Sequence, residues 1–180
     1  MRWLTFLVCA AVLMVLQTVV APRVELFGAR PDWLLMMVVF YAMHGTMPAA
    51  AIGAWGIGAC ADLMTLERPG LIAMSYLLVA ILVALVRDFL FRLESLTQFV
   101  LTFTASLLVQ TGWYLYRWGL YGAAESALSD YVVNCLLASV YTAGWAVLFH
   151  KALLSRSRLL GIGQPKYRYT GLGQVAGTRV

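Results

Sequence analysis

The stretch AIGAWGIGACADLMTLERPG, residues 51–70, decides the fold of this chain, because it is almost entirely small or apolar until Asp62 interrupts it. A run of about 20 apolar residues is long enough to cross a bilayer. A carboxylate near the end of such a helix needs a partner, because an unpaired charge in apolar surroundings is costly. The partner of Asp62 is therefore the first question that the sequence raises.

The composition places the whole chain among membrane proteins. Of its 180 residues, 62% are hydrophobic and 12% are charged, and the mean hydropathy is +0.83. Soluble domains carry about twice this share of charged residues. The length allows five or six membrane-spanning helices and excludes a separate soluble catalytic domain. The three cysteines lie in apolar segments, so the sequence suggests neither a disulfide framework nor a zinc site.

Six apolar runs are candidates for membrane-spanning helices. The second is short, about 21 Å at 1.5 Å per residue, against a hydrocarbon core of about 30 Å. Gly45 and Pro48 separate it from the third run, which favours two helices over one long helix. We therefore predict an all-α integral membrane protein with six transmembrane helices in residues 1–150 and a basic cytoplasmic tail in residues 151–180. The runs are Trp3–Ala21, Pro31–His44, Met47–Leu66, Leu71–Val86, Leu96–Tyr116 and Tyr131–Phe149.

The distribution of basic residues gives the expected orientation. Lys and Arg accumulate in the cytoplasmic segments of membrane proteins. With six spans and a cytoplasmic N-terminus, nine of the 13 basic residues lie inside and four lie outside. A five-span arrangement with an external N-terminus places ten inside and three outside, so the charge rule leaves both open. The two arrangements agree from about Asp62 onward, and both put the tail in the cytoplasm.

Small residues follow one side of the third run at helical spacing and lead to Asp62. Small side chains let two helices approach closely, which supplies association in lipid that the hydrophobic effect cannot supply. The spacing leaves open whether the opposing helix belongs to this chain or to a partner. The carboxylate could orient a partner, or it could cap the turn that follows. The candidate partner-binding residues are Ala50, Gly53, Ala54, Gly58 and Asp62.

Amide side chains in three other runs form a polar layer with Asp62. Under the six-span arrangement, Gln17, Gln110 and Asn134 lie about 4–10 Å inside the outer ends of their helices. Polar groups at this depth usually face the protein interior or a wet cavity and often mark function. Each could also make an ordinary interhelical hydrogen bond of about 0.6 kcal/mol.

The sequence contains no pattern that supports catalysis. It has neither a GxSxG elbow nor an HExxH motif. His44 and His150 are far apart in the sequence, which argues against a shared metal site. We therefore expect no enzyme activity, no cofactor and no metal. The basic tail fits contact with anionic membrane lipid rather than nucleic acid.

The chain up to about residue 150 resembles the MreD family of bacterial rod-shape-determining proteins, and the specific part of this resemblance lies in about residues 30–90. The matching pattern consists of a short motif before the second run, a glycine-rich third run ending in GACADL, a Pro-Gly turn, and an alanine and a serine in the fourth run. In this sequence these elements are Arg30-Pro31-Asp32, Gly58 to Leu63, Pro69-Gly70, and Ala73 with Ser75.

This resemblance implies a multi-pass protein of the bacterial inner membrane, with six helices and both termini in the cytoplasm. It implies a fold similar to the substrate-binding subunits of energy-coupling-factor vitamin transporters, used as a non-catalytic scaffold. The implied partners are the single-span protein MreC and, through it, the glycosyltransferase RodA with its transpeptidase and the actin-like MreB filament. No small-molecule substrate is expected.

Two functions remain open at this point. In the first, the small-residue side and the polar layer hold a partner helix within the complex that elongates the peptidoglycan wall. In the second, the protein is a small-solute binding subunit of a transporter, and a vitamin-like ligand satisfies the polar layer. The first is favoured, because no aromatic cage or cluster of charges converges on the layer.

Overall fold

The fold is described from a computed structural model, which describes residues 3–26, 28–65, 69–87, 94–121 and 128–155. These residues form six α-helices and one short 3-10 helix, so the predicted all-α class is confirmed. The tail from residue 156 and most of the charged segment around residue 90 lie outside the described residues. The elements are α1 (Trp3–Val19), η1 (Ala21–Val24), α2 (Trp33–His44), α3 (Met47–Leu63), α4 (Leu71–Val86), α5 (Glu94–Tyr121) and α6 (Leu128–Ser155).

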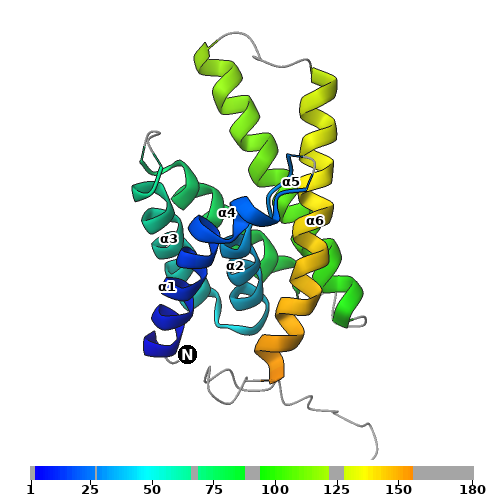
Figure 1. Cartoon of the computed structure of the whole chain (residues 1–180). Coiled ribbons are helices and arrows are strands. Elements are labelled where there is room, and N and C mark those ends of the chain that lie inside the picture. The colour runs from blue at the N-terminus through cyan, green and yellow to red at the C-terminus, as the bar shows by residue number, and fades with distance from the viewer. Residues whose placement is uncertain (1–2, 27, 66–68, 88–93, 122–127, 156–180) are drawn as a thin grey trace, which may run out of the picture.

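The six helices run alternately up and down, so the first and the last described helix ends lie at the same end of the bundle (Figure 1). We call this the lower end, as Figure 1 draws it, and the opposite end the upper end. The upper end carries η1, the end of α3 and the start of α4. The polar layer predicted from the sequence belongs to this upper end.

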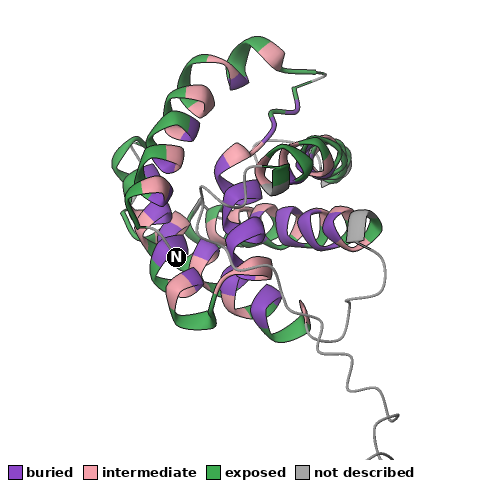
Figure 2. Cartoon of the chain, turned by 90° about the horizontal axis from the view of Figure 1, so that it is seen from below, coloured by how far each residue is buried: buried purple, intermediate pink, exposed green. Residues whose placement is uncertain are grey.

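Helix α2, predicted as the weakest span, is the centre of the bundle. It contacts all five other α-helices, and nine consecutive residues from Leu34 to Ala42 are buried. Buried positions on the other helices lie where they face their neighbours (Figure 2). At about 18 Å, α2 is too short to cross a bilayer alone. The other five α-helices surround it, and polar groups from α1 and α4 bind the backbone at its two ends.

The lower end of α2 shows how this backbone is satisfied. Helix α2 ends at His44, and Gly45 leaves the helical conformation. The guanidinium of Arg87, at the end of α4, donates hydrogen bonds to the carbonyl oxygens of Ala42 and Gly45. A Cβ atom at Gly45 would lie 2.7 Å from the carbonyl oxygen of Tyr41, so this tight exit from the helix requires glycine.

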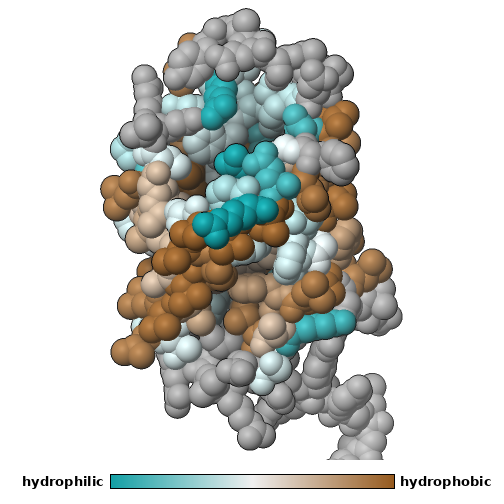
Figure 3. Space-filling model, viewed as in Figure 1, coloured by the Kyte–Doolittle hydropathy of each residue, from teal (hydrophilic) through white to brown (hydrophobic). Residues whose placement is uncertain are grey.

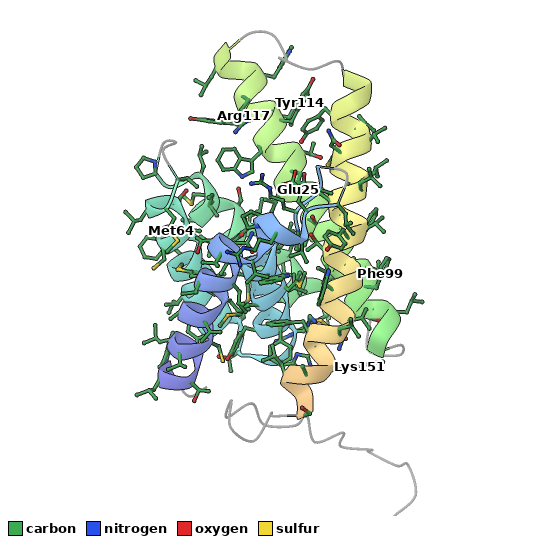
Figure 4. The ribbon with its side chains drawn as sticks, viewed as in Figure 1. Glu25, Met64, Phe99, Tyr114, Arg117 and Lys151 are labelled. Atoms are coloured by element: carbon green, nitrogen blue, oxygen red, sulfur yellow. The ribbon has the colours of Figure 1, made fainter. Side chains whose placement is uncertain are left out.

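Helices α5 and α6 are longer than the predicted spans, because their packing continues above the bundle (Figure 1). Each has 28 residues, or about 42 Å. The rings of Tyr114 and Tyr131 stack with centroids 4.1 Å apart, and Figure 4 shows Tyr114 on the side of α5 that faces α6. Helix α5 therefore continues beyond the predicted span end at Tyr116, and α6 begins before Tyr131, although the apolar span within α6 begins at Tyr131 as predicted.

The outer surface carries many large apolar side chains. Leu4, Leu63 and Leu148 are 78%, 82% and 62% exposed, and hydrophobic residues cover much of the lower half of the face in Figure 3. Soluble monomers rarely expose apolar surface on this scale. Within the described residues, one segment, Tyr131–Leu153, is long and apolar enough to cross a membrane, and α1 to α4 are shorter apolar helices.

Candidate functional site

The carboxylate of Asp62 binds the start of the next helix. One oxygen accepts hydrogen bonds from the backbone N–H groups of Gly70 and Ala73, at 2.9 and 3.0 Å, and the other accepts one from Ile72 at 3.0 Å. The first N–H groups of a helix have no partner within the helix, and a carboxylate also interacts favourably with this positive end. Asp62 is 3% exposed. The capping alternative for this residue is therefore confirmed.

The turn between α3 and α4 is shaped for this contact. Gly70 precedes α4 with a φ of 106°, a left-handed conformation that glycine adopts without steric cost. This conformation accompanies the hydrogen bond from the Gly70 N–H to the Asp62 carboxylate. The Pro-Gly pair quoted above thus belongs to one local motif with Asp62.

Gly58 lies where α3 and α4 touch backbone to backbone. A Cβ atom at this position would lie 2.4 Å from the Cα atom of Ala73 and 2.9 Å from the carbonyl oxygen of Ile72. No real Cβ atom approaches a neighbour this closely, so the two helices pack as they do only because residue 58 is glycine. The same helix carries Gly56 on another side, where a Cβ atom would meet nothing within 4 Å.

The other candidate partner-binding residues are also buried within the chain. Ala50 and Ala54 are 3% and 2% exposed. Gly53 packs against α1, where a Cβ atom would lie 2.9 Å from the ring of Phe6. The structure thus places all five residues at contacts between helices of this chain.

Gln17 connects the end of α1 to the start of α2. Its side-chain N–H donates to the carbonyl oxygen of Pro31 at 3.3 Å, and its side-chain oxygen accepts from the backbone N–H of Trp33 at 2.9 Å. Both partners belong to the segment that enters the central helix. Gln17 therefore satisfies the backbone at the upper end of α2, as Arg87 does at the lower end.

Asp32 lies beside Gln17 and joins three helices. Its carboxylate accepts the backbone N–H of Leu35 at 3.0 Å, which caps α2, and the hydroxyl of Tyr76 from α4 at 2.8 Å. Its backbone N–H donates to the hydroxyl of Thr142 from α6 at 3.3 Å. Asp32 is partly exposed, in contrast to Asp62.

A cavity of about 460 Å³ opens beside Asp32, and we call it the upper cavity. It lies between the segment before α2, the end of α1, and the facing sides of α5 and α6. Most of its wall is polar, which is unusual for a cavity in an apolar bundle. Its lining includes Gln17, Glu25, Arg30, Asp32, Ser106, Gln110, Asn134 and Thr142.

A second cavity of about 340 Å³ lies on the other side of Asp32. It shares Gln17, Asp32, Val109 and Trp113 with the upper cavity. The rest of its lining is more apolar and includes Met14, Leu34, Met64 and Ile72. We call it the side cavity. The two cavities together offer a polar compartment next to an apolar one.

The structure therefore divides the predicted polar layer. Gln17, Gln110 and Asn134 line the upper cavity, whereas Asp62 is absent from the lining of either cavity and is bound by α4. Asp32 is the site residue that the sequence reasoning missed. Its position between a proline and an apolar run is typical of a helix N-cap, and this could have marked it as a second carboxylate at the depth of the layer.

His44 and His150 lie close together in space, although they are far apart in the sequence. The rings of His44 and His150 have centroids 6.4 Å apart, and both rings pack against Phe40. This proximity arises because α2 and α6 meet at the lower end. Among the described residues, no group of three or more potential ligands could hold a metal ion.

Comparison with known proteins identifies the family of this chain. The sequence model described as "rod shape-determining protein MreD" matches residues 1–155, which include every described residue. The chain belongs to the MreD family. No curated protein and no solved structure matches the chain. The expected likeness to the substrate-binding subunits of vitamin transporters therefore stays a prediction.

Membership in the MreD family gives the features above a context. MreD proteins are membrane proteins that act in determining rod shape. The match spans α1 to α6, so it includes both the contact between α3 and α4 and the upper cavity. Both features therefore lie within the region that matches the MreD family.

Proposed function

We propose that this protein is a non-catalytic scaffold of the machinery that elongates the cell wall, held in the bacterial inner membrane by six helices. The family match over residues 1–155 is the observation that carries this proposal. The exposed apolar side chains of the bundle support a position in lipid. The short central helix agrees with it, since the other five helices enclose α2.

We place both termini in the cytoplasm. The alternation of the six helices supports an even number of crossings, because the described chain begins and ends at the lower end (Figure 1). Lys151 lies at the lower end of α6, and Arg117 lies at the upper end of α5 (Figure 4). With the lower end inside, nine of the 13 basic residues face the cytoplasm. This satisfies the positive-inside rule.

We propose that the scaffold binds MreC and, through it, RodA and the elongation transpeptidase, with an indirect link to MreB. The buried residues of α3 contribute to this binding by fixing the position of α4, since their side chains are occupied within the chain. Ala50, Gly53, Ala54, Gly58 and Asp62 then act as positioning residues. The outward side of α3 presents Ile52 and Trp55, 60% and 52% exposed, with open space at Gly56.

Depletion of the protein in its own bacterium tests the scaffold role. We expect rod-shaped cells to become round, and expression of the full chain to restore the rods. Normal shape combined with a new nutrient requirement would contradict the scaffold and favour a transporter subunit. Cell width and length, measured by microscopy over several generations, give the readout.

Two substitutions on the same helix separate the internal contact from the outer surface. Gly58→Leu forces a side chain into the backbone of α4, whereas Gly56→Leu places the same side chain in open space. If the position of α4 matters for MreC, Gly58→Leu reduces co-purification of MreC while the protein still inserts into the membrane. If MreC contacts the outer side of α3, Gly56→Leu reduces it as well. Full recovery of MreC with both variants would argue against any role of α3.

The upper cavity favours a second candidate function. Three residues of the predicted polar layer line a space of about 460 Å³ that side chains leave open. A small-solute binding subunit needs such a space. Thermal stabilisation of the purified protein by a vitamin-like solute would support this candidate, and an unchanged midpoint across a panel of such solutes would count against it.

A further inference from the structure

We propose that the upper cavity binds a ligand through a primary ammonium group, which pairs with the carboxylate of Asp32. This inference is independent of the scaffold role, because it concerns the cavity rather than any protein partner. It adds the chemical class of the ligand, which neither candidate function specifies.

The charges in the cavity wall point to a cationic ligand. The wall contains three charged side chains, Glu25, Arg30 and Asp32. Arg30 and Glu25 form an ion pair at 2.6 Å, so their charges compensate each other. Asp32 makes no ion pair with any residue that the structure describes. Asp32 is therefore the one acidic or basic side chain of the wall that has no oppositely charged partner among the described residues.

The hydrogen bonds of Asp32 leave acceptor capacity for a ligand. A carboxylate offers about four lone-pair positions. The Leu35 N–H and the Tyr76 hydroxyl occupy part of this capacity from inside the bundle. The exposed part of Asp32 lines the cavities. A carboxylate in this setting is stabilised most by a cation that also donates hydrogen bonds.

The remaining wall suits the three N–H donors of an ammonium group. Ser106, Gln110 and Asn134 contribute oxygen acceptors from α5 and α6, opposite the segment that carries Asp32. Asn134 is exposed, and the Gln110 amide donates to the Ser106 hydroxyl at 3.5 Å, the outer limit of a hydrogen bond. These side chains can turn toward a ligand without breaking a strong bond.

The side cavity gives the ligand an apolar part. It meets the upper cavity at Asp32 and Trp113, and its wall contains Met14, Met64 and Ile72. A ligand with its ammonium group at Asp32 can extend an alkyl chain into this space. Two sources supply this chemistry: a soluble alkylamine, or the ethanolamine headgroup of a membrane lipid with its own acyl chain nearby.

Thermal unfolding of the full chain in phosphatidylcholine nanodiscs, followed by tryptophan fluorescence, tests the proposal. The probe is hexylammonium, with hexanol as the neutral match and hexyltrimethylammonium as a cation without N–H donors. We expect hexylammonium alone to raise the unfolding midpoint in a saturable manner. The Asp32→Asn variant, which keeps an acceptor for Leu35 and Tyr76, should bind at least tenfold more weakly. Ser75→Ala, on α4 and outside both linings, should bind as the wild type does.

A second variant keeps the test valid if Asp32→Asn does not fold. Asn134→Leu replaces an exposed oxygen acceptor of the cavity wall with a larger apolar side chain and should abolish the shift. Nanodiscs of phosphatidylethanolamine identify the source. If the lipid is the ligand, they raise the wild-type midpoint and remove the response to hexylammonium. If a soluble amine is the ligand, the response persists in both lipids.

Three results would overturn the proposal. Equal shifts with hexanol and hexylammonium would show partition into apolar surface only. Equal shifts in the wild type, Asp32→Asn and Asn134→Leu would show that the amine binds elsewhere. No response in either lipid would also exclude an ammonium site in this cavity.

Discussion

Removal of the Asp62 carboxylate should destabilise the protein more than most single substitutions, because three N–H groups of α4 then lose their acceptor. In Asp62→Ala, the buried N–H of Ala73 is left without an acceptor, which costs about 1–3 kcal/mol. Loss of the helix cap itself costs about 1 kcal/mol. The N–H groups of Gly70 and Ile72 are partly buried and recover part of their loss from water. We expect a total of about 3–4 kcal/mol.

Asp62→Asn should cost about half as much. Its single carbonyl oxygen can replace the oxygen that binds Gly70 and Ala73. The amide then turns an N–H donor toward the N–H of Ile72, and the favourable interaction of the negative charge with the helix start is lost. We therefore predict that stability decreases in the order wild type, Asp62→Asn, Asp62→Ala.

The assay is thermal unfolding of the purified full chain in nanodiscs. A loss of 1 kcal/mol lowers the midpoint of a protein of this size by about 2–4 °C, so Asp62→Ala should lower it by about 10 °C. Thr65→Ala is the matched control, because Thr65 is an exposed neighbour that donates to the backbone oxygen of Asp62 at 2.9 Å. We expect it to cost less than about 1 kcal/mol. An Asp62→Ala midpoint within 2 °C of the Thr65→Ala midpoint would refute the reasoning.

Three further predictions use the same assay. Gly58→Ala should lose about 1–3 kcal/mol through overlap with α4, whereas Gly56→Ala should be neutral or gain about 0.5–1 kcal/mol; equal effects would contradict the close contact. Tyr76→Phe should cost about 1.5–3 kcal/mol, since its hydroxyl binds a carboxylate, and a smaller loss in an Asp32→Asn background would show the coupling. Arg87→Met should cost about 1–3 kcal/mol, because two carbonyl oxygens at the lower end of α2 lose their hydrogen-bond donor, and an unchanged midpoint would disprove this role.

The helices of the bundle could be predicted from the sequence, but their surroundings could not. Apolar runs of suitable length identified all six, and the boundaries of α4 agree with the prediction. A run that is apolar on every side fits lipid and protein equally well, so the sequence did not reveal that α2 is enclosed. Its shortness was the one available signal. A helix that protein surrounds need not match the thickness of the membrane.

Asp62 and Asp32 differ in how far their partners lie along the chain, and this decides which of the two roles could be predicted from the sequence. Asp62 binds N–H groups 8 to 11 residues away, across one turn, so the capping alternative could be stated from the local sequence. Asp32 binds Tyr76, 44 residues away, and its backbone binds Thr142, 110 residues away. No local pattern specifies such contacts.

The same distinction separates structure from function in this bundle. Asp62 has little capacity left for a ligand, because its carboxylate oxygens already accept hydrogen bonds from the turn and helix that follow it. A carboxylate placed by three helices around an open cavity keeps such capacity, and Asp32 is in this position. Substitution of Asp62 should therefore act mainly through stability, and substitution of Asp32 mainly through what the cavity binds. If Asp32→Asn lowered the unfolding midpoint as much as Asp62→Asn and left hexylammonium binding intact, the two carboxylates would have the same structural role, and this assignment would fail.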